Sequence, residues 1–308
     1  MTTAQSAIPA TNRIQRDAIL LYISQGKLRT RRKVDPASVE TDIDKSLLHI
    51  SKDILTSKEL EDIGSFDNAV RNWVRVRCLP SPLKGKGVYI LPVRLIEPVL
   101  KYLDQAKKDR QPLIDKFCEF YEQRKREAQP KLGSGFIETD YPALDHVRST
   151  FTFEVQVWTL ETPGQLSAIN KDLYQREVAR MNNMWQEATR TVSGVLCAEM
   201  HKLTQHLSER LANGIDGKKK IFRDSAITNL TEWLDLFSAR NLSDDAELEK
   251  VVEKAKKLIK GVDPETIRDS EHLRIDLQKD FATMASDLDR LLVDRPLRAI
   301  DLDFNGGT

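Results

Sequence analysis

The stretch from Ser167 to Asn213 reads SAINKDLYQREVARMNNMWQEATRTVSGVLCAEMHKLTQHLSERLAN, and it decides the fold class of this chain. Apolar positions recur through it about every 3.75 residues, which is 45 residues in twelve steps from Leu166 to Leu211. This spacing is close to the period of a straight α-helix and exceeds the 3.5 residues of a left-handed coiled coil. We therefore predict one long amphipathic helix, roughly 70 Å in length at 1.5 Å per residue, which Asn213-Gly214 ends.

A helix of this length cannot bury its apolar side alone, so we expect it to pack against another long helix or a second subunit. One acidic residue, Glu177, falls on the apolar side and is our candidate for an interface residue, through a basic partner on a neighbouring helix. A local shift of register is the alternative explanation. The predicted inward positions are Leu166, Ile169, Leu173, Glu177, Met181, Met184, Ala188, Val192, Leu196, Met200, Leu203, Leu207 and Leu211.

The rest of the sequence also predicts mainly helices. A capping-box pattern at Thr56–Glu59 starts one helix, and a second long helix follows Pro92, with Pro112 expected to kink or split it. Short strands are expected at residues 18–24, 88–91 and 151–158, from β-branched or alternating apolar residues. Three further helices are expected at about 223–240, 244–260 and 271–294, and an extended segment at 297–303.

Together these patterns predict a mainly α fold. It is expected to be an elongated long-helix hairpin or coiled-coil-like bundle with a few short β-strands and a C-terminal helical module. We divide the chain into a flexible tail at 1–16, a long-helix body with small strand elements at 17–214, and the C-terminal helical module at 215–308.

The composition excludes several classes of protein. The chain carries 48 basic and 47 acidic side chains, a net charge of +1, whereas proteins that coat nucleic acid are usually strongly basic. Cys78, Cys118 and Cys197 are far apart and odd in number, which predicts buried free thiols rather than disulfides or a zinc site. No apolar run is long enough to span a membrane, and residues 1–13 lack the core of a signal peptide, so we expect a cytoplasmic protein.

Basic residues gather in two places. Residues 1–34 carry seven basic and one acidic side chain, and residues 35–62 carry eight acids and three lysines, so the two blocks are expected to neutralise each other locally or across a subunit contact. With Arg71, Arg75 and Arg77, and with Trp73 and Tyr89 as stacking surfaces, the basic clusters could form a groove for phosphates. A solvated, counter-charged surface is the alternative. The residues for contact with nucleic acid or phosphate are Arg29, Arg31, Arg32, Lys33, Lys218, Lys219 and Lys220.

No set of residues has the spacing that catalysis or metal binding requires. His201 and His206 are five residues apart and point in different directions from a helix, and the other histidines are isolated. The turn Lys84–Gly87 lacks the pattern of a phosphate-binding loop. We therefore expect no enzyme activity, no cofactor and no metal.

Four stretches resemble a family of phage, prophage and plasmid proteins that is defined only as a domain of unknown function. They are NWVRVRCLPSPL at Asn72–Leu83, GVYILPVRLIEPVLKYL at Gly87–Leu103, DYPALDHVRSTFTF at Asp140–Phe153 and RAIDLD at Arg298–Asp303. The resemblance extends from about residue 18 to 303. Genes of that family often stand beside genes for MoxR-type AAA+ ATPases and von Willebrand factor A-type proteins, which implies a bacterial host cytoplasm and an adaptor for an ATP-driven machine.

The leading hypothesis is a non-enzymatic phage or mobile-element protein that forms a homo-oligomeric scaffold or adaptor. An AAA+ ATPase or a von Willebrand factor A-type protein is the expected partner. The alternative hypothesis is a nucleic-acid-binding accessory protein in phage replication or recombination, whose binding would weaken steeply with salt.

Overall fold

The computed structural model describes residues 13–83, 85–162, 164–212 and 222–293. These residues form ten α-helices and six short β-strands, so the predicted mainly helical fold is confirmed. Their contacts divide the chain into two compact units. The α6 unit comprises residues 13–20, 76–96 and those from 158 onward, and the α3 unit comprises residues 21–75 and 97–157.

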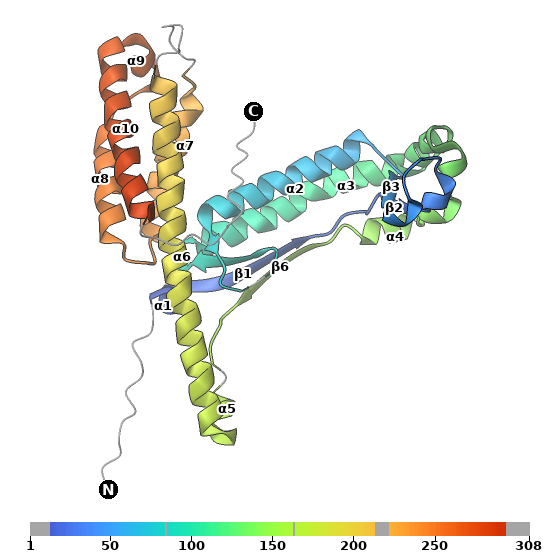
Figure 1. Ribbon diagram of the computed structural model, residues 1–308, viewed down its shortest axis with the longest axis horizontal. Coiled ribbons are helices and arrows are strands. Elements are labelled where there is room, and N and C mark those ends of the chain that lie inside the picture. Colours follow the sequence, from blue (N-terminus) through green and yellow to red (C-terminus); the bar gives the residue numbers. More distant parts are fainter. Residues whose placement is uncertain (1–12, 84, 163, 213–221, 294–308) are drawn as a thin grey trace. The chain divides into compact units, whose positions relative to one another are not determined.

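The predicted long helix is present as α6, Lys171–Leu211 (Figure 1). It begins later than expected, because Asn170 adopts an extended backbone and its side chain accepts a hydrogen bond from the Leu173 amide at 2.9 Å. Asparagine is among the best residues for capping a helix in this way. The residues before it form the separate short helix α5, Gln165–Ile169. The start predicted at Ser167 is therefore wrong, and the predicted end at Asn213-Gly214 lies outside the described residues.

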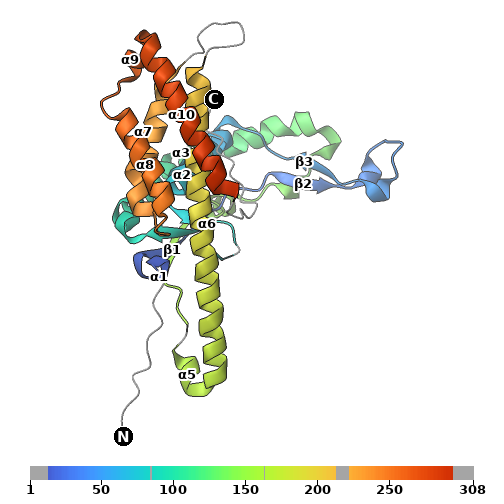
Figure 2. The ribbon, with the colours of Figure 1, turned by 60° about the vertical axis from the view of Figure 1, so that its left-hand side comes forward.

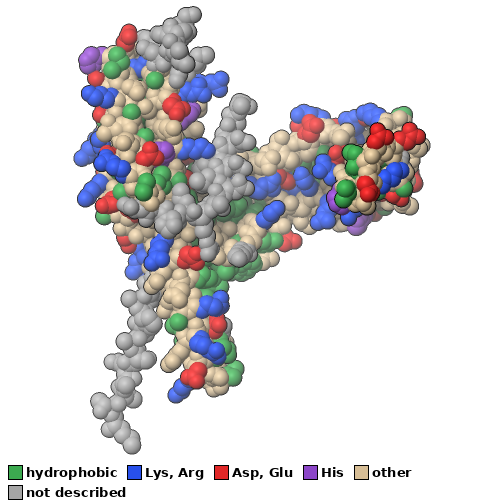
Figure 3. All heavy atoms as spheres, in the orientation of Figure 1, with side chains coloured by type: hydrophobic (Ala, Val, Ile, Leu, Met, Phe, Trp, Pro, Cys, Tyr) green, Lys and Arg blue, Asp and Glu red, His purple; other side chains and the backbone are tan. Residues whose placement is uncertain are grey.

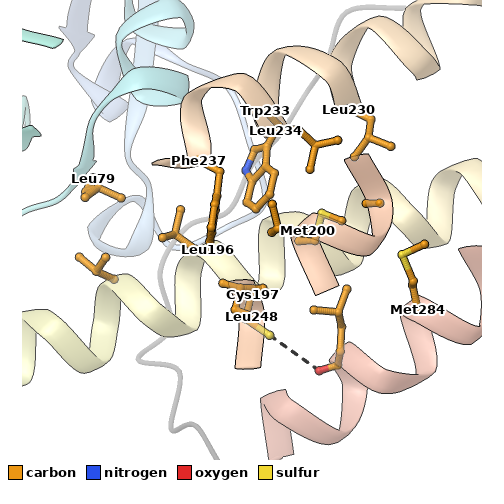
Figure 4. Packing of buried hydrophobic residues seen from close by; sticks show 14 of the residues in the cluster. Leu79, Leu196, Cys197, Met200, Leu230, Trp233, Leu234, Phe237, Leu248 and Met284 are labelled. Carbon is orange, nitrogen blue, oxygen red and sulfur yellow. Dashed lines mark hydrogen bonds between the residues drawn. The ribbon is translucent and has the colours of Figure 1, made fainter. Parts of the chain in front are cut away.

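Within its unit, α6 packs along α10, Glu271–Val293, and against α7, Asp224–Arg240. Figure 4 shows the apolar core between these helices, where the Cys197 thiol lies 3.8 Å from the Leu288 carbonyl oxygen. Seven predicted inward positions of α6 are buried there, which confirms the period for this part of the helix. They are Met181, Ala188, Val192, Leu196, Met200, Leu207 and Leu211.

The remaining helices of this unit are α1 Arg13–Asp17, α8 Ala246–Ile259 and α9 Pro264–Asp269. Asp245 accepts a hydrogen bond from the Leu248 amide at the start of α8, and Asp263 accepts one from the Glu265 amide at the start of α9. The helices predicted at about 223–240, 244–260 and 271–294 are α7, α8 and α10, which begin and end within two residues of these positions because caps and apolar period agree there.

The α3 unit is built on α2, Lys58–Arg77, and α3, Ile96–Leu132. The long helix predicted after Pro92 is α3, and its core partner in this unit is α2. A split at Pro112 is not observed, since α3 continues through this residue. Pro112 is exposed, so the backbone carbonyl that loses its donor can bind water, and the buried positions on either side hold the helix together. The helix α2 is capped by Ser57, one residue later than predicted.

The strands predicted at 18–24, 88–91 and 151–158 are β1 Ala18–Gln25, β5 Val88–Pro92 and β6 Phe153–Trp158. With β4, Leu79–Pro80, they form one sheet in the order β4-β5-β1-β6. A second antiparallel sheet, β2 Arg31–Val34 with β3 Ile50–Asp53, was not predicted. A short helix, α4 Leu144–Ser149, starts after Pro142.

The predicted boundary between residues 214 and 215 lies outside the described residues, as do most of the predicted tail and the segment 297–303. The described helices on the two sides of that boundary, α6 and α7 to α10, share one hydrophobic core. The division into three segments stays a prediction.

Candidate functional site

The basic cluster at residues 27–33 presents its charges alternately. Lys27, Arg29, Arg31 and Lys33 are exposed, and we call these four the basic row. Between them, Leu28 is buried and takes part in the core of the α3 unit. Arg31–Val34 form the strand β2, in which successive side chains point to opposite faces and every second residue repeats about every 6.6 Å, whereas residues 26–30 belong to no strand.

Strand pairing brings acidic residues toward this row. Arg31 is the register partner of Asp53, and its Nε lies 3.6 Å from the Asp53 carboxylate. The predicted neutralisation between the basic and acidic blocks therefore occurs locally at this position. Among the described residues, no acidic side chain forms an ion pair with Lys27, Arg29 or Lys33, so three of the four charges of the basic row are open to solvent or a ligand.

Arg32 belongs to the opposite face of the strand. Its guanidinium donates to the backbone carbonyls of Arg29 at 2.7 Å and Asp140 at 3.1 Å. Lys52 lies 2.8 Å from the Asp140 carboxylate and completes this cluster. Arg32 thus connects the β2–β3 strand pair to the segment around Asp140. The other predicted contact residues, Lys218, Lys219 and Lys220, lie outside the described residues.

One of the two aromatic side chains proposed for base stacking, Trp73, is already stacked within the fold. The Trp73 ring lies 3.7 Å from the Tyr102 ring centroid at an interplanar angle of 13°. Arg71 donates to Gln25 and Asn68, and Arg77 lies 2.6 Å from the Glu232 carboxylate. These contacts occupy Trp73, Arg71 and Arg77 within the fold.

Glu177 lies near the start of α6, half-buried, and its carboxylate accepts a hydrogen bond from Arg180 Nε at 2.7 Å. Its partner is thus on the same helix, three residues away. Leu173 and Met184, both half-buried, continue the row on which these two charges lie. We call Leu173, Glu177, Arg180 and Met184 the α6 stripe.

The first ten residues of α6 contain no buried side chain, and the first buried residue is Met181. Figures 1 and 2 both show α5 beside this end of the helix, away from α7, α8 and α10. Ile169 at the end of α5 is 78% exposed. The N-terminal part of α6 is therefore the least covered part of the helix.

Sequence reasoning missed a buried ion pair in the α3 unit. Arg110 and Asp67 are almost fully buried and meet through two hydrogen bonds of 2.8 and 2.9 Å. Arg110 also donates to the carbonyls of Gly26 at 2.7 Å and Thr152 at 2.9 Å. The chain approaches itself closely here, since a Cβ on Gly26 would lie 2.4 Å from the Thr152 hydroxyl oxygen. Arg110 therefore joins α2, α3 and two extended segments.

A second buried cluster holds the core of the α6 unit. Glu199 accepts from Trp233 Nε1 at 2.7 Å and from Arg240 Nη2 at 3.0 Å. Arg240 Nη2 also donates a long hydrogen bond of 3.5 Å to the Cys78 carbonyl oxygen. Both carboxylate oxygens of Glu199 accept hydrogen bonds from the fold itself, which is typical of a structural ion pair.

The shifted pKa values have structural causes. The hydrogen bond from Arg124 is the main reason why the pKa of Glu59 falls to about 2. Burial raises the pKa of Cys78 to about 12, and it also raises the pKa of Cys118. The prediction of buried free thiols is confirmed for all three cysteines. Thiols with raised pKa values are poor nucleophiles at neutral pH.

The remaining polar side chains of the described residues do not form a site for a metal ion. No group of three or more His, Cys, Asp and Glu side chains could hold a metal ion in the described part of the chain. A shallow hollow along α8 is lined by alternating Glu and Lys side chains. Basic and acidic groups are interspersed on the face shown in Figure 3. No helix of the described ranges is long and apolar enough to cross a membrane.

No family model matches the chain, and no curated protein or solved structure matches it either.

Proposed function

We propose that this protein is a non-enzymatic scaffold or adaptor that associates with copies of itself. The observation that supports self-association is the thinly covered N-terminal part of α6, where Lys171–Arg180 contain half-buried residues but no buried one. Ten helical residues extend about 15 Å, and short helices are marginally stable in water without packing. A second copy would supply the missing surface.

The arrangement of the buried charges supports a structural role for them. The carboxylates of the two buried ion pairs, Asp67 and Glu199, each bind an arginine and accept further hydrogen bonds. A general acid or base must reach its substrate with a proton to exchange. Side chains held in this way join elements of the fold.

Light scattering after size exclusion, over a concentration series, tests self-association. We expect the average mass to rise above the 35.2 kDa of one chain as the concentration increases. A mass that stays at one chain up to the highest soluble concentration would contradict the proposal.

We extend the proposal to an adaptor of a mobile genetic element, on the strength of the family resemblance. In this role the chain would bind a MoxR-type AAA+ ATPase or a von Willebrand factor A-type protein. Purification of the tagged chain from infected or lysogenic cells should recover such a partner. Recovery of the chain alone, under conditions that retain other complexes, would remove this part of the proposal.

A second candidate function, binding of nucleic acid, is favoured by the basic row. Its four cations are exposed at every second position of the sequence, and Lys27, Arg29 and Lys33 have no acidic partner in the described ranges. Phosphate contacts of this kind release counterions, so affinity falls steeply with salt. The net charge of +1 places this function second.

The test compares the basic row with exposed lysines elsewhere. We expect Arg29→Glu with Lys33→Glu to weaken binding of labelled DNA or RNA and to lower the salt slope by about one for each lost phosphate contact. Lys250→Glu with Lys254→Glu on α8 is the control, with the same charge change. Equal effects of the two double variants, or no binding at low salt, would exclude a specific role for the row.

A further inference from the structure

We infer that two copies of this chain pair through the α6 stripe in an antiparallel arrangement, with the two-fold axis between Val178 and Ala179. The inference rests on the proposed self-association and names the surface that carries it. A second copy is the occupant because the stripe is complementary to itself.

The stripe has the spacing of a helix-pairing surface. Leu173, Glu177, Arg180 and Met184 follow one another at intervals of four, three and four residues. Such intervals keep side chains on one face of a helix and are those of the contact positions in helix pairs. Apolar residues stand at both ends of the stripe, and opposite charges stand in the middle.

The complementarity follows from the numbering. In an antiparallel pair related by a two-fold axis, facing residues have numbers with a constant sum. For a sum of 357, Leu173 faces Met184 of the partner and Glu177 faces Arg180 of the partner. One axis therefore satisfies both the apolar and the charged pairs.

Neighbouring residues agree with this axis. Over residues 171–186, a sum of 357 places no two like charges opposite each other, since Lys171 faces Gln186. The positions opposite Asp172 and Arg176 are Trp185 and Met181, which stay buried in the core of their own chain. An overlap of sixteen residues is about 24 Å long. This is a small interface, so we expect a dissociation constant on the order of micromolar.

Leu173, Glu177 and Arg180 lie outside the core, whereas the half-buried Met184 packs against the edge of the core and keeps only part of its side chain exposed. The stripe lies about a quarter turn around α6 from the buried residues Met181 and Trp185. Glu177 and Arg180 are 30% and 66% exposed, and their hydrogen bond within the helix leaves room for a second charged partner. In the pair, two glutamates and two arginines would alternate around the axis.

Two single variants test the pairing by rescue in trans. Glu177→Arg places four positive charges at the axis and Arg180→Glu places four negative ones, so each variant alone should lose affinity for itself by more than about tenfold. An equal mixture of the two variants restores opposite charges across the axis and should form a heterodimer. The double variant E177R/R180E should associate like the wild type.

The rescue separates pairing between chains from the ion pair within one helix. Each single variant loses its intrahelical partner, and mixing cannot restore a contact within a chain. Glu247→Arg with Lys250→Glu, an exposed pair of the same spacing on α8, is the control and should leave association unchanged. Circular dichroism of each variant checks that it is folded.

A second measurement does not depend on charge. A Leu173→Cys chain mixed with a Met184→Cys chain should form a disulfide-linked dimer under mild oxidation, because facing positions bring the two Cβ atoms together. Either chain alone should cross-link much less, and the three native cysteines are buried.

The outcomes are distinct. Association of the wild type together with trans rescue supports the inference. Three results would overturn the inference and leave the scaffold proposal in place: association that the single variants do not weaken, variants whose association is not restored by mixing, and cysteine variants that form no disulfide-linked dimer. A wild-type chain that is monomeric at every concentration would overturn both.

Discussion

Arg110 shows how much of the α3 unit depends on one side chain. Its guanidinium makes four hydrogen bonds to Asp67, Gly26 and Thr152, and these groups come from segments far apart in the sequence. A buried guanidinium without its counter-charge is far costlier than the intact pair is stabilising. Individual polar residues of this kind specify which segments meet.

We predict that Asp67→Ala destabilises the protein by about 3–5 kcal/mol, because Arg110 would stay buried without a counter-charge. Chemical denaturation followed by circular dichroism measures the change. Asp62→Ala, which removes only an exposed pair with Lys58, is the control and should have little effect. Similar losses in the two variants would show that the buried pair has no special role.

Glu59 gives a pH dependence with a defined sign. Its pKa is about 2 in the folded chain, below the ordinary value, mainly through Arg124. A carboxyl with a lowered pKa stabilises the fold above its unfolded pKa of about 4.3, and this stabilisation is lost as the pH falls toward 2. The free energy of unfolding of the wild type should therefore fall more steeply from pH 5 to pH 2 than that of Glu59→Gln. Parallel curves for the two proteins would contradict this assignment.

At the scale of elements, the joint between α5 and α6 separates two helices that the apolar period alone joins. Leu166 and Ile169 continue the spacing of α6, so the sequence predicts one helix from Ser167. The competing interaction is the cap made by Asn170, whose side chain replaces a backbone acceptor at the start of α6. The uncovered part of α6 begins at this cap.

We predict that Asn170→Ala loosens the first turns of α6 without unfolding the α6 unit. Loss of such a cap costs about 1 kcal/mol, and the core of the helix starts only at Met181. Hydrogen exchange of the amides in residues 171–176 should accelerate, and the thermal midpoint should change little. Asn170→Asp retains an acceptor and should exchange like the wild type. Unchanged exchange in the alanine variant would show that the cap does not hold this end.

A helix or strand can be predicted from the sequence when the interactions that define it are local and repeated. Long helices such as α6 and α10 are predictable because their period repeats over many turns and their caps are local. The hairpin β2–β3 is not, because charged residues such as Arg31 and Lys52 carry little strand preference and their pairing partners lie across a loop.

The candidate site divides in the same way. The exposed charges of the basic row follow from the sequence alone, but the different role of Arg32 depends on Asp140, which is 108 residues away. The partners of Asp67 and Glu199 are likewise 43 and 41 residues distant. Such contacts are set by tertiary packing, and single-sequence patterns do not contain them.

At the scale of the whole molecule, two units each have their own apolar core and their own buried ion pair. The surface charges are nearly balanced, and the described cysteines are buried. The N-terminal end of α6 extends beyond the core of its unit, and we propose that this thinly covered end associates with a second copy. The function proposed for the molecule depends on that end.

Hydrogen exchange of the wild-type chain at a series of concentrations tests this claim most directly, because it reports both association and its location. We expect amides in residues 171–186 to exchange more slowly as the concentration rises, while amides of α6 beyond residue 186 stay unchanged. Exchange of residues 171–186 that is the same at every concentration would show that this end of α6 does not associate.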